Sequence, residues 1–201
     1  MSSIRYQLLK KLSGFVERIN GFSSREKAKQ LQQSLGYCGE GVHWSTNFVV
    51  ASPENVYLGK NVSIAQNAVF LASMADLRIG NYVMFGPNVT IVTGEHRTDM
   101  VGEYMRNITE DMKLPENDQE VVIEDDVWVG SNVTILKGTH IGRGSIIHAG
   151  SVVSGKIRPY TVYLGPKLKI SRFNDEEIEQ HEKMLLKKYG PQPDIATIGK
   201  A

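Results

Sequence analysis

Large apolar residues recur at steps of six through the middle of the chain. In groups of six, positions 58–69 read LGKNVS-IAQNAV, positions 79–90 read IGNYVM-FGPNVT, and positions 123–152 read IEDDVW-VGSNVT-ILKGTH-IGRGSI-IHAGSV. The first place of each group is aliphatic or aromatic, and the fifth is Val, Ala, Ser or Thr. This period is typical of a parallel β-helix, in which each group supplies one side and one corner of a three-sided coil. The alternative, a sandwich of short strands, rarely keeps a strict step of six.

The fourth place of the groups predicts the corners of the coil. It holds asparagine at 61, 67, 88 and 132 and glycine at 138, 144 and 150. These two residue types adopt positive φ angles more readily than others, as tight corners require. The period does not decide the hand of the coil, because the general rule for parallel crossovers favours right-handed connections.

Helical patterns flank the repeat. Residues 4–35 read as helical, with an apolar stripe that includes Leu8, Leu12 and Phe15 and is broken near Gly21; a second segment restarts after Ser23-Ser24, and Gly36 ends it. Near the other end, Asn174 and Glu177 form the pattern of a capping box, and Gly190-Pro191 closes a second helix. These patterns predict an N-terminal helical segment over 1–41, a β-helix over 42–170, and a C-terminal helix and tail over 171–201.

Charge and composition narrow the function. A formal net charge of +1 lacks the excess of basic residues that binds polyanions, which argues against nucleic acid as a ligand. The chain has no apolar window long enough for a membrane span and no signal-peptide pattern at its start, so we expect a cytoplasmic protein. The single cysteine, Cys38, cannot form an intramolecular disulfide and lies in a glycine-rich connector, where we expect no catalytic role.

Two stretches carry a family resemblance. IGNYVMFGPNVTIVTGEH and IEDDVWVGSNVTILKGTHIGRGSIIHAGSVVSGKIRPYTV are similar to the maltose and galactoside O-acetyltransferase group of the left-handed β-helix, or hexapeptide-repeat, acyltransferases. The resemblance runs from about residue 48 to residue 173. It implies an all-β core formed by a left-handed parallel β-helix, a homotrimer, acetyl-CoA as co-substrate, and active sites that lie between neighbouring subunits.

The repeat breaks off at TIVTGEHRTDM, residues 90–100. In the resembling family this position carries the catalytic histidine, which implies His96 as the catalytic residue and a long inserted loop, residues 97–122, that closes over the site. A neutral imidazole is well matched to take a proton from a hydroxyl at neutral pH, and such a mechanism needs no metal. Glu95, Glu103 or a carbonyl of the loop could orient the ring. The alternative is an ordinary surface histidine.

The resemblance also implies binding residues. Trp128 would flank the thioester channel, although a subunit contact is an alternative role, and Ser131, Ala149 and Ser154 would line the coenzyme groove. Lys167 and Arg172 would meet its phosphates, unless they are ordinary solvated charges. Where the family carries an asparagine for the acceptor, this chain has Ala65, followed by Gln66 and Asn67. That departure predicts a different acceptor pocket, with Gln66 and Asn67 as candidates.

The favoured function is therefore an acetyl-CoA-dependent O-acetyltransferase acting on a saccharide or glycan-related hydroxyl. Acetylation of an antibiotic or other xenobiotic is a close variant. A zinc enzyme of the carbonic anhydrase kind is an alternative, but His140 and His148 are expected to face different sides of the coil. A β-helix that is only a scaffold is the third possibility.

Overall fold

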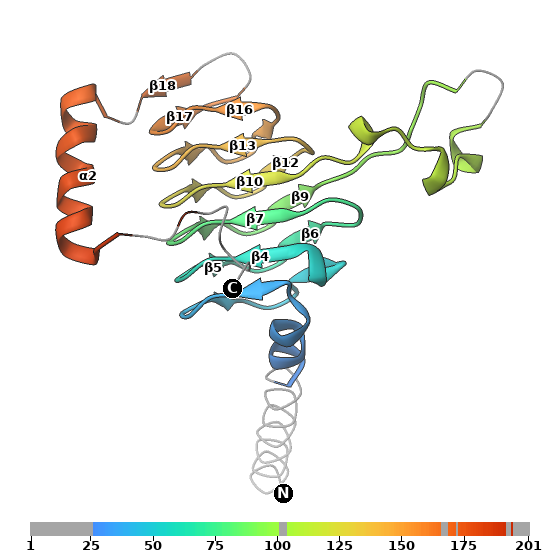
Figure 1. Ribbon diagram of the computed structural model, residues 1–201, viewed down its shortest axis with the longest axis horizontal. Coiled ribbons are helices and arrows are strands. Elements are labelled where there is room, and N and C mark those ends of the chain that lie inside the picture. The colour runs from blue at the N-terminus through green and yellow to red at the C-terminus, as the bar shows by residue number, and fades with distance from the viewer. Residues whose placement is uncertain (1–25, 101–103, 166–168, 172, 192–193, 195–201) are drawn as a thin grey trace, which may run out of the picture. The chain divides into compact units, whose positions relative to one another are not determined.

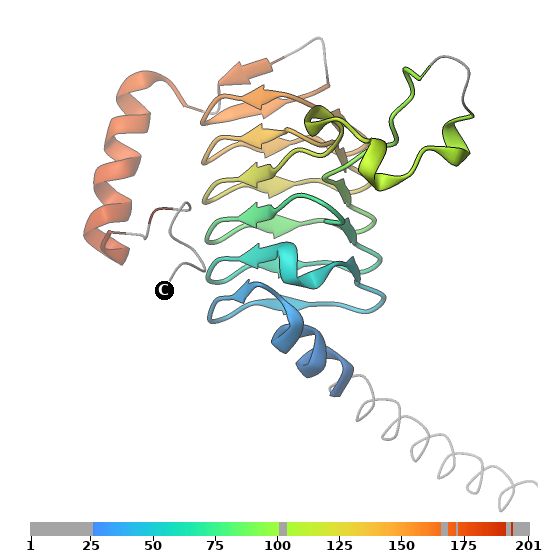
Figure 2. The same ribbon diagram turned by 45° about the vertical axis from the view of Figure 1, so that its right-hand side comes forward.

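The repeat forms a left-handed parallel β-helix (Figures 1 and 2). The computed structural model describes residues 26–100, 104–165, 169–171, 173–191 and 194. The chain divides into two compact units, residues 1–35 and 36–201. In the first unit, residues 26–34 are helical, and the apolar stripe predicted before residue 26 lies outside the described residues.

Three sheets make the sides of the coil, and each strand pairs with the strands one turn before and after it. Sheet A contains β1 (Tyr37–Cys38), β4 (Val56–Leu58), β7 (Leu77–Ile79), β10 (Val121–Ile123), β13 (His140–Ile141) and β16 (Lys156–Ile157). Sheet B contains β2 (His43–Trp44), β5 (Ser63–Ile64), β8 (Met84–Phe85), β11 (Trp128–Val129), β14 (Ile146–Ile147) and β17 (Thr161–Tyr163), with β18 (Lys169–Ser171) antiparallel at its end. Sheet C contains β3 (Val49–Ala51), β6 (Val69–Leu71), β9 (Thr90–Val92), β12 (Thr134–Ile135) and β15 (Val152–Val153).

The core is the stack of first-place and fifth-place residues. All nine predicted first-place residues are at most 3% exposed: Leu58, Ile64, Ile79, Phe85, Ile123, Val129, Ile135, Ile141 and Ile147. The fifth-place residues, from Val62 to Ser151, are buried beside them. Each side chain packs against its equivalents one strand spacing above and below, so the interior is a set of continuous apolar columns.

The corners follow the prediction as well. Every fourth-place asparagine and glycine has a positive φ, between 54° at Asn61 and 76° at Gly150. At the corner between sheets B and C, the asparagine amides form a ladder in which Asn47 donates to Asn67, Asn67 to Asn88, and Asn88 to Asn132, at 3.0–3.1 Å. The asparagines of the ladder thus adopt the positive φ that the corner requires and also link four successive turns by hydrogen bonds.

The observed boundaries differ from the predicted ones. The first turn begins at Tyr37 rather than at residue 42, so Cys38 is half-buried inside the β-helix and not in a connector. Cys38, Trp44 and Val50 keep the step of six, and they pair with Leu58, Ile64 and Phe70. This turn escaped detection because its first-place residues include cysteine and tryptophan. The inserted segment spans residues 93–120, because β10 already begins at Val121.

The C-terminal helix α2 (Asp175–Tyr189) begins at the predicted capping box and ends at Gly190. It lies beside the corner between sheets A and B, on the side of the coil away from the inserted segment (Figure 1). Arg143 forms an ion pair with Glu182 of the helix at 2.8 Å. No helix among the described residues is long and apolar enough to cross a membrane. A short 3-10 helix, η1 (Pro53–Asn55), joins the first turn to the second.

Candidate active site

An arm, defined as residues 93–120, leaves the coil after β9 and returns before β10 (Figure 2). It contains the 3-10 helices η2 (Met105–Asn107), η3 (Glu110–Met112) and η4 (Pro115–Asn117). Its outgoing and returning halves pair at the root: Gly94 and Asp118 form an antiparallel bridge, and the Gln119 amide donates to the Thr93 carbonyl at 2.8 Å. The root is therefore an ordered continuation of the coil.

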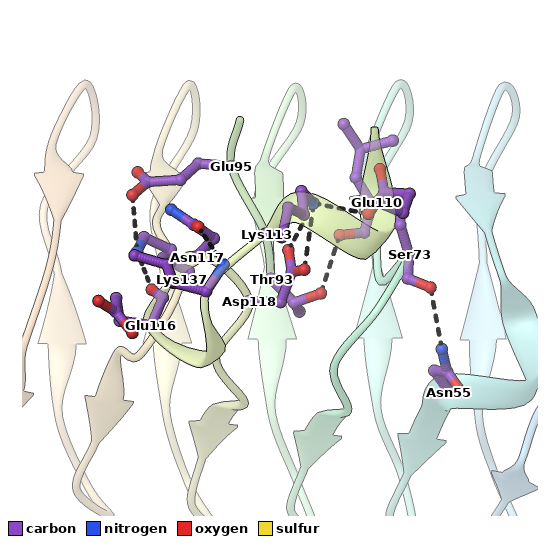
Figure 3. A network of polar contacts seen from close by, with 12 residues as sticks. Asn55, Ser73, Thr93, Glu95, Glu110, Lys113, Glu116, Asn117, Asp118 and Lys137 are labelled. Atoms are coloured by element: carbon purple, nitrogen blue, oxygen red, sulfur yellow. Dashed lines mark hydrogen bonds and ion pairs between the residues drawn. The ribbon is translucent and has the colours of Figure 1, made fainter. Parts of the chain in front are cut away.

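A lysine near the root fixes the returning half of the arm (Figure 3). The Lys113 ammonium lies 3.0 Å from carboxylate oxygens of both Asp118 and Glu110, and its side chain is only 13% exposed. Burial alone would lower the pKa of Lys113, but the hydrogen bonds and charges of Asp118 and Glu110 outweigh it, and the pKa is raised. Lys113 thus remains charged and joins η3, through Glu110, to the residue that follows η4, Asp118.

His96 lies at the root of this arm, between two anchored neighbours. Before it, the Glu95 amide donates to the Asn117 carbonyl at 2.9 Å. After it, Arg97 donates to the Met112 carbonyl at 2.7 Å and pairs with Asp99. The imidazole itself is exposed, and no hydrogen-bond partner of the ring is found among the described residues. Glu103, one predicted orienting group, lies outside those residues, and a single chain does not enclose His96.

Lys137 joins the coil to both halves of the arm. Its ammonium lies 2.7 Å from the Glu95 carboxylate and donates to the Glu116 carbonyl (Figure 3). The Lys137 side chain is 18% exposed. Sequence patterns did not single this residue out, because nothing local in the sequence links a corner lysine to a glutamate on the previous turn.

Trp128 lies on the outer face of sheet B, as its sixth place predicts, and half of its surface is exposed. Its register partners are Met84, which is also exposed, and Ile146. A large indole exposed beside a methionine is an apolar surface of the kind that a partner or a ligand covers.

Ser131 and Ala149 are brought together on successive turns at the corner between sheets B and C. The Gly150 amide donates to the Ser131 carbonyl at 2.8 Å. A Cβ on Gly130 would lie 2.7 Å from the Ala149 amide nitrogen, so the two turns approach this closely only because residue 130 is glycine. Trp128, Ser131 and Ala149 therefore lie along one flank of the coil.

The remaining predicted coenzyme residues are placed differently. Ser154 is exposed and follows β15, at the corner between sheets C and A from which the arm also leaves. It is therefore separated from Ser131 and Ala149 by one side of the coil. Lys167 and Arg172 lie outside the described residues.

The two predicted acceptor residues lie at the corner between sheets B and C, two turns before Ser131. Gln66 is exposed, and its carbonyl accepts from the Asn88 amide. The side chain of Asn67 has a structural role instead, because its amide both donates and accepts within the asparagine ladder. Of the pair, Gln66 retains a side chain that the ladder does not use.

A cavity of about 520 Å³ opens elsewhere, between α2 and the corner joining sheets A and B. Its lining includes Asp125, Tyr160 and Tyr189, and none of the predicted site residues. Burial, followed by the hydrogen bond to Glu182, raises the pKa of Tyr160 well above its usual range. Burial also raises the pKa of Asp125, against the opposing effect of hydrogen bonds from Asn81.

The predicted separation of two histidines is observed. His140 lies in sheet A and is bonded to Glu124 at 2.6 Å, whereas the His148 ring donates from Nδ1 to the Ala149 carbonyl at 3.2 Å, at the corner between sheets B and C. Among the residues that the structure describes, no three His, Cys, Asp or Glu side chains converge as metal ligands would.

Comparisons with known proteins agree with this architecture. Residues 120–155 match the family model described as bacterial transferase hexapeptide (six repeats). A Saccharomyces cerevisiae protein, assigned as an acetyltransferase by inference, is 32% identical over 153 residues, which is 73% of this chain and 70% of that protein. The galactoside O-acetyltransferase of Lactococcus lactis is 33% identical over 132 residues, 64% of this chain and 58% of that protein.

Among solved structures, a hexapeptide-repeat acetyltransferase from Vibrio cholerae complexed with acetyl-CoA is 28% identical, with a TM-score of 0.62 over 75% of this chain and 79% of that one. The chain spans 55% and 58% of the first curated relatives it matches. The period of six, the three-sided coil, the arm and these similarities together show that the chain belongs to the hexapeptide-repeat acyltransferase family, whose fold is the left-handed parallel β-helix.

Proposed function

We propose that this chain transfers an acetyl group from acetyl-CoA to a hydroxyl of a saccharide or glycan-related acceptor, with His96 as general base. The observation that carries the proposal is the position of His96 at the root of an anchored arm, in a chain whose relatives are acetyltransferases. The reaction requires an imidazole that takes the proton from the acceptor hydroxyl as its oxygen attacks the thioester carbonyl. The tetrahedral adduct then expels the thiolate of coenzyme A.

The site is completed by a second copy of the chain. His96 is exposed in one chain and Trp128 lies on another side of the coil, so neither is enclosed without a neighbour. Exposed apolar side chains support such contacts: Tyr104, Met105 and Met112 on the arm, and Met84 and Trp128 on sheet B. In a cyclic trimer the arm of each chain would meet the sheet B flank of the next, with Trp128, Ser131 and Ala149 along the coenzyme groove.

The proposal also assigns Ser154, Lys167 and Arg172 to coenzyme A, the two cations to its phosphates. Ser154 lies one side of the coil away from Ser131 and Ala149, so it would reach the coenzyme from a different chain of the trimer. Gln66 is the acceptor residue that the proposal retains. A saccharide acceptor is favoured by the galactoside O-acetyltransferase similarity and by the exposed, polar character of Gln66 and its surroundings. Lysinibacillus sphaericus has a relative, 32% identical over 128 residues, that is assigned by inference to macrolide acetylation, so a hydroxylated antibiotic is the second candidate acceptor class.

The test is thiol release from acetyl-CoA with methyl galactoside, maltose and a macrolide as acceptors. Replacement His96→Ala should lower turnover by about 10²–10⁴-fold, because one positioned proton acceptor contributes roughly that much. The variant should keep the oligomeric mass and circular dichroism of the parent. His43→Ala, which removes an exposed histidine from the first turn, is the matched control and should keep full activity. Equal turnover in His96→Ala and the parent would refute the assignment.

A further inference from the structure

Lys137 stands out among the contacts of the arm because it is the group through which the coil holds the chain directly before His96. Its ammonium reaches the carboxylate of Glu95 on the outgoing half and the carbonyl of Glu116 on the returning half. The Lys137 side chain is 18% exposed and the Glu95 side chain 55% exposed, so the contact lies at the surface of the root with the lysine chain packed against it. Two acceptors on opposite halves of the arm, rather than one, constrain where the Lys137 ammonium lies.

The rest of the root does not depend on Lys137. Its two halves are paired by the Gly94–Asp118 bridge and by the Glu95–Asn117 and Gln119–Thr93 backbone hydrogen bonds. Lys113 adds the ion pair with Asp118. These contacts form the arm and join its halves to each other. Backbone hydrogen bonds from Thr93 to the Leu71 carbonyl and from Gly138 to the Gln119 carbonyl join the root to the neighbouring turns. Lys137 lies on the next turn and adds a side-chain contact to Glu95, the residue directly before His96.

We propose that Lys137 is a positioning residue for the acetyl transfer: through Glu95 and the Glu116 carbonyl it fixes the root of the arm and so the location of the His96 imidazole relative to the thioester. The inference rests on the proposed function. A general base acts only within hydrogen-bond reach of the proton it removes, and a displacement of about 1 Å can cost about 10²-fold in rate. His96 is next to Glu95 in the chain, so loss of this anchor is transmitted through a single peptide unit.

The geometry also predicts a hierarchy among variants. Lys137→Met removes both contacts, while Glu95→Gln removes the charge of one partner and leaves the Glu116 carbonyl available to Lys137. Lys137→Arg retains a cation with several donors at this corner. We therefore expect Lys137→Met to have the largest effect, Glu95→Gln a smaller one, and Lys137→Arg the smallest.

The experiment measures kcat and KM for acetyl-CoA in the full-length chain, with the acceptor that gives the fastest thiol release. Lys137→Met should lower kcat by about tenfold to a hundredfold and change KM for acetyl-CoA by less than about twofold, since neither contact of Lys137 involves a residue assigned to the coenzyme. Lys137→Arg should recover kcat to within about threefold of the parent. The double variant Lys137→Met with Glu95→Gln should be no slower than Lys137→Met alone, because the contact that Glu95→Gln weakens is already lost in Lys137→Met.

Controls separate this inference from the proposed function. Lys156→Met removes an exposed lysine of β16 and should leave kcat unchanged. One outcome would overturn the positioning role alone. In it the parent transfers acetyl, His96→Ala does not, and Lys137→Met keeps a kcat within about twofold of the parent. A His96→Ala variant as active as the parent would overturn the proposed function, and the positioning role with it. If Lys137→Met fails to fold, Glu95→Gln decides, because a kcat equal to that of the parent contradicts the role of the contact.

Discussion

At the scale of single residues, Asp125 shows how the coil uses a buried acid. Its carboxylate accepts from the backbone amide of Asn81 at 2.7 Å and from the Asn81 side chain at 3.1 Å, which links two turns at the corner under α2. Burial nevertheless dominates, and the pKa of Asp125 is raised from 3.8. The acid therefore makes a structural link whose strength depends on pH.

The raised pKa gives a prediction with a definite sign. The folded chain binds this proton more tightly than the unfolded chain, so Asp125 contributes most to stability below its unfolded value of 3.8, and the contribution falls as the pH rises through the folded value. Asp125→Asn, which keeps an acceptor for the Asn81 amide, should remove that dependence. Urea unfolding of both chains between pH 4 and pH 7 measures it. A stability difference that does not vary over this interval would contradict the account.

At the scale of elements, the asparagine ladder combines two contributions in each residue. The amide bonds the turns above and below, while the backbone adopts a left-handed conformation, φ 59° at Asn88. At the same corner, one turn after Asn132, Gly150 takes the left-handed conformation without a ladder amide, φ 76°. The chain thus contains both solutions to one corner.

Two substitutions at Asn88 separate these contributions. Asn88→Gly keeps the conformation and loses the two ladder hydrogen bonds, which should cost about 1–2 kcal/mol in the free energy of unfolding. Asn88→Ala loses the bonds and also strains the backbone, which should cost about 1–2 kcal/mol more. The stabilities of the two variants and the parent are compared by their unfolding midpoints in urea, measured at one protein concentration. An alanine variant as stable as the glycine variant would show that the conformation is not costly at this corner.

At the scale of the whole molecule, the proposed site is divided between faces that one chain keeps apart. The arm carries His96 at the corner between sheets C and A, and sheet B carries Trp128. Tyr104 on the arm is 81% exposed and Trp128 is 50% exposed, which are high values for such large side chains. Assembly with other copies would cover both residues and bring the two faces together.

Subunit mixing tests this arrangement. His96→Ala and Trp128→Ala should each be nearly inactive alone, because each lacks one half of every site. Random mixing of the two in equal amounts, by dissociation and reassembly, should restore about one quarter of the sites, because a site needs the intact face from each of two neighbours. Recovery of acetyl transfer on mixing is the measurement. A mixture that stays inactive after exchange is confirmed by mass spectrometry would mean that both residues act within one chain.

The candidate site is only partly readable from sequence. The histidine at the break of the repeat, the outward tryptophan and the neighbouring Ser131 and Ala149 are found by place in the period, and their predicted roles await these tests. Lys137, Asp118 and the ladder role of Asn67 are not found, because each depends on a partner on another turn. A period of six shows which residues stack, but it does not show which polar side chains reach across a corner.

The sequence by itself determined the coil, its inward columns and its positive-φ corners, because every turn repeats the same local requirement and the repetition is visible as a period. Only the tertiary structure decided where the coil starts, how the arm is anchored, and that His96 remains uncovered in a single chain. These features arise from contacts between residues far apart in the chain. Each such contact occurs once, so it produces no repeating pattern in the sequence.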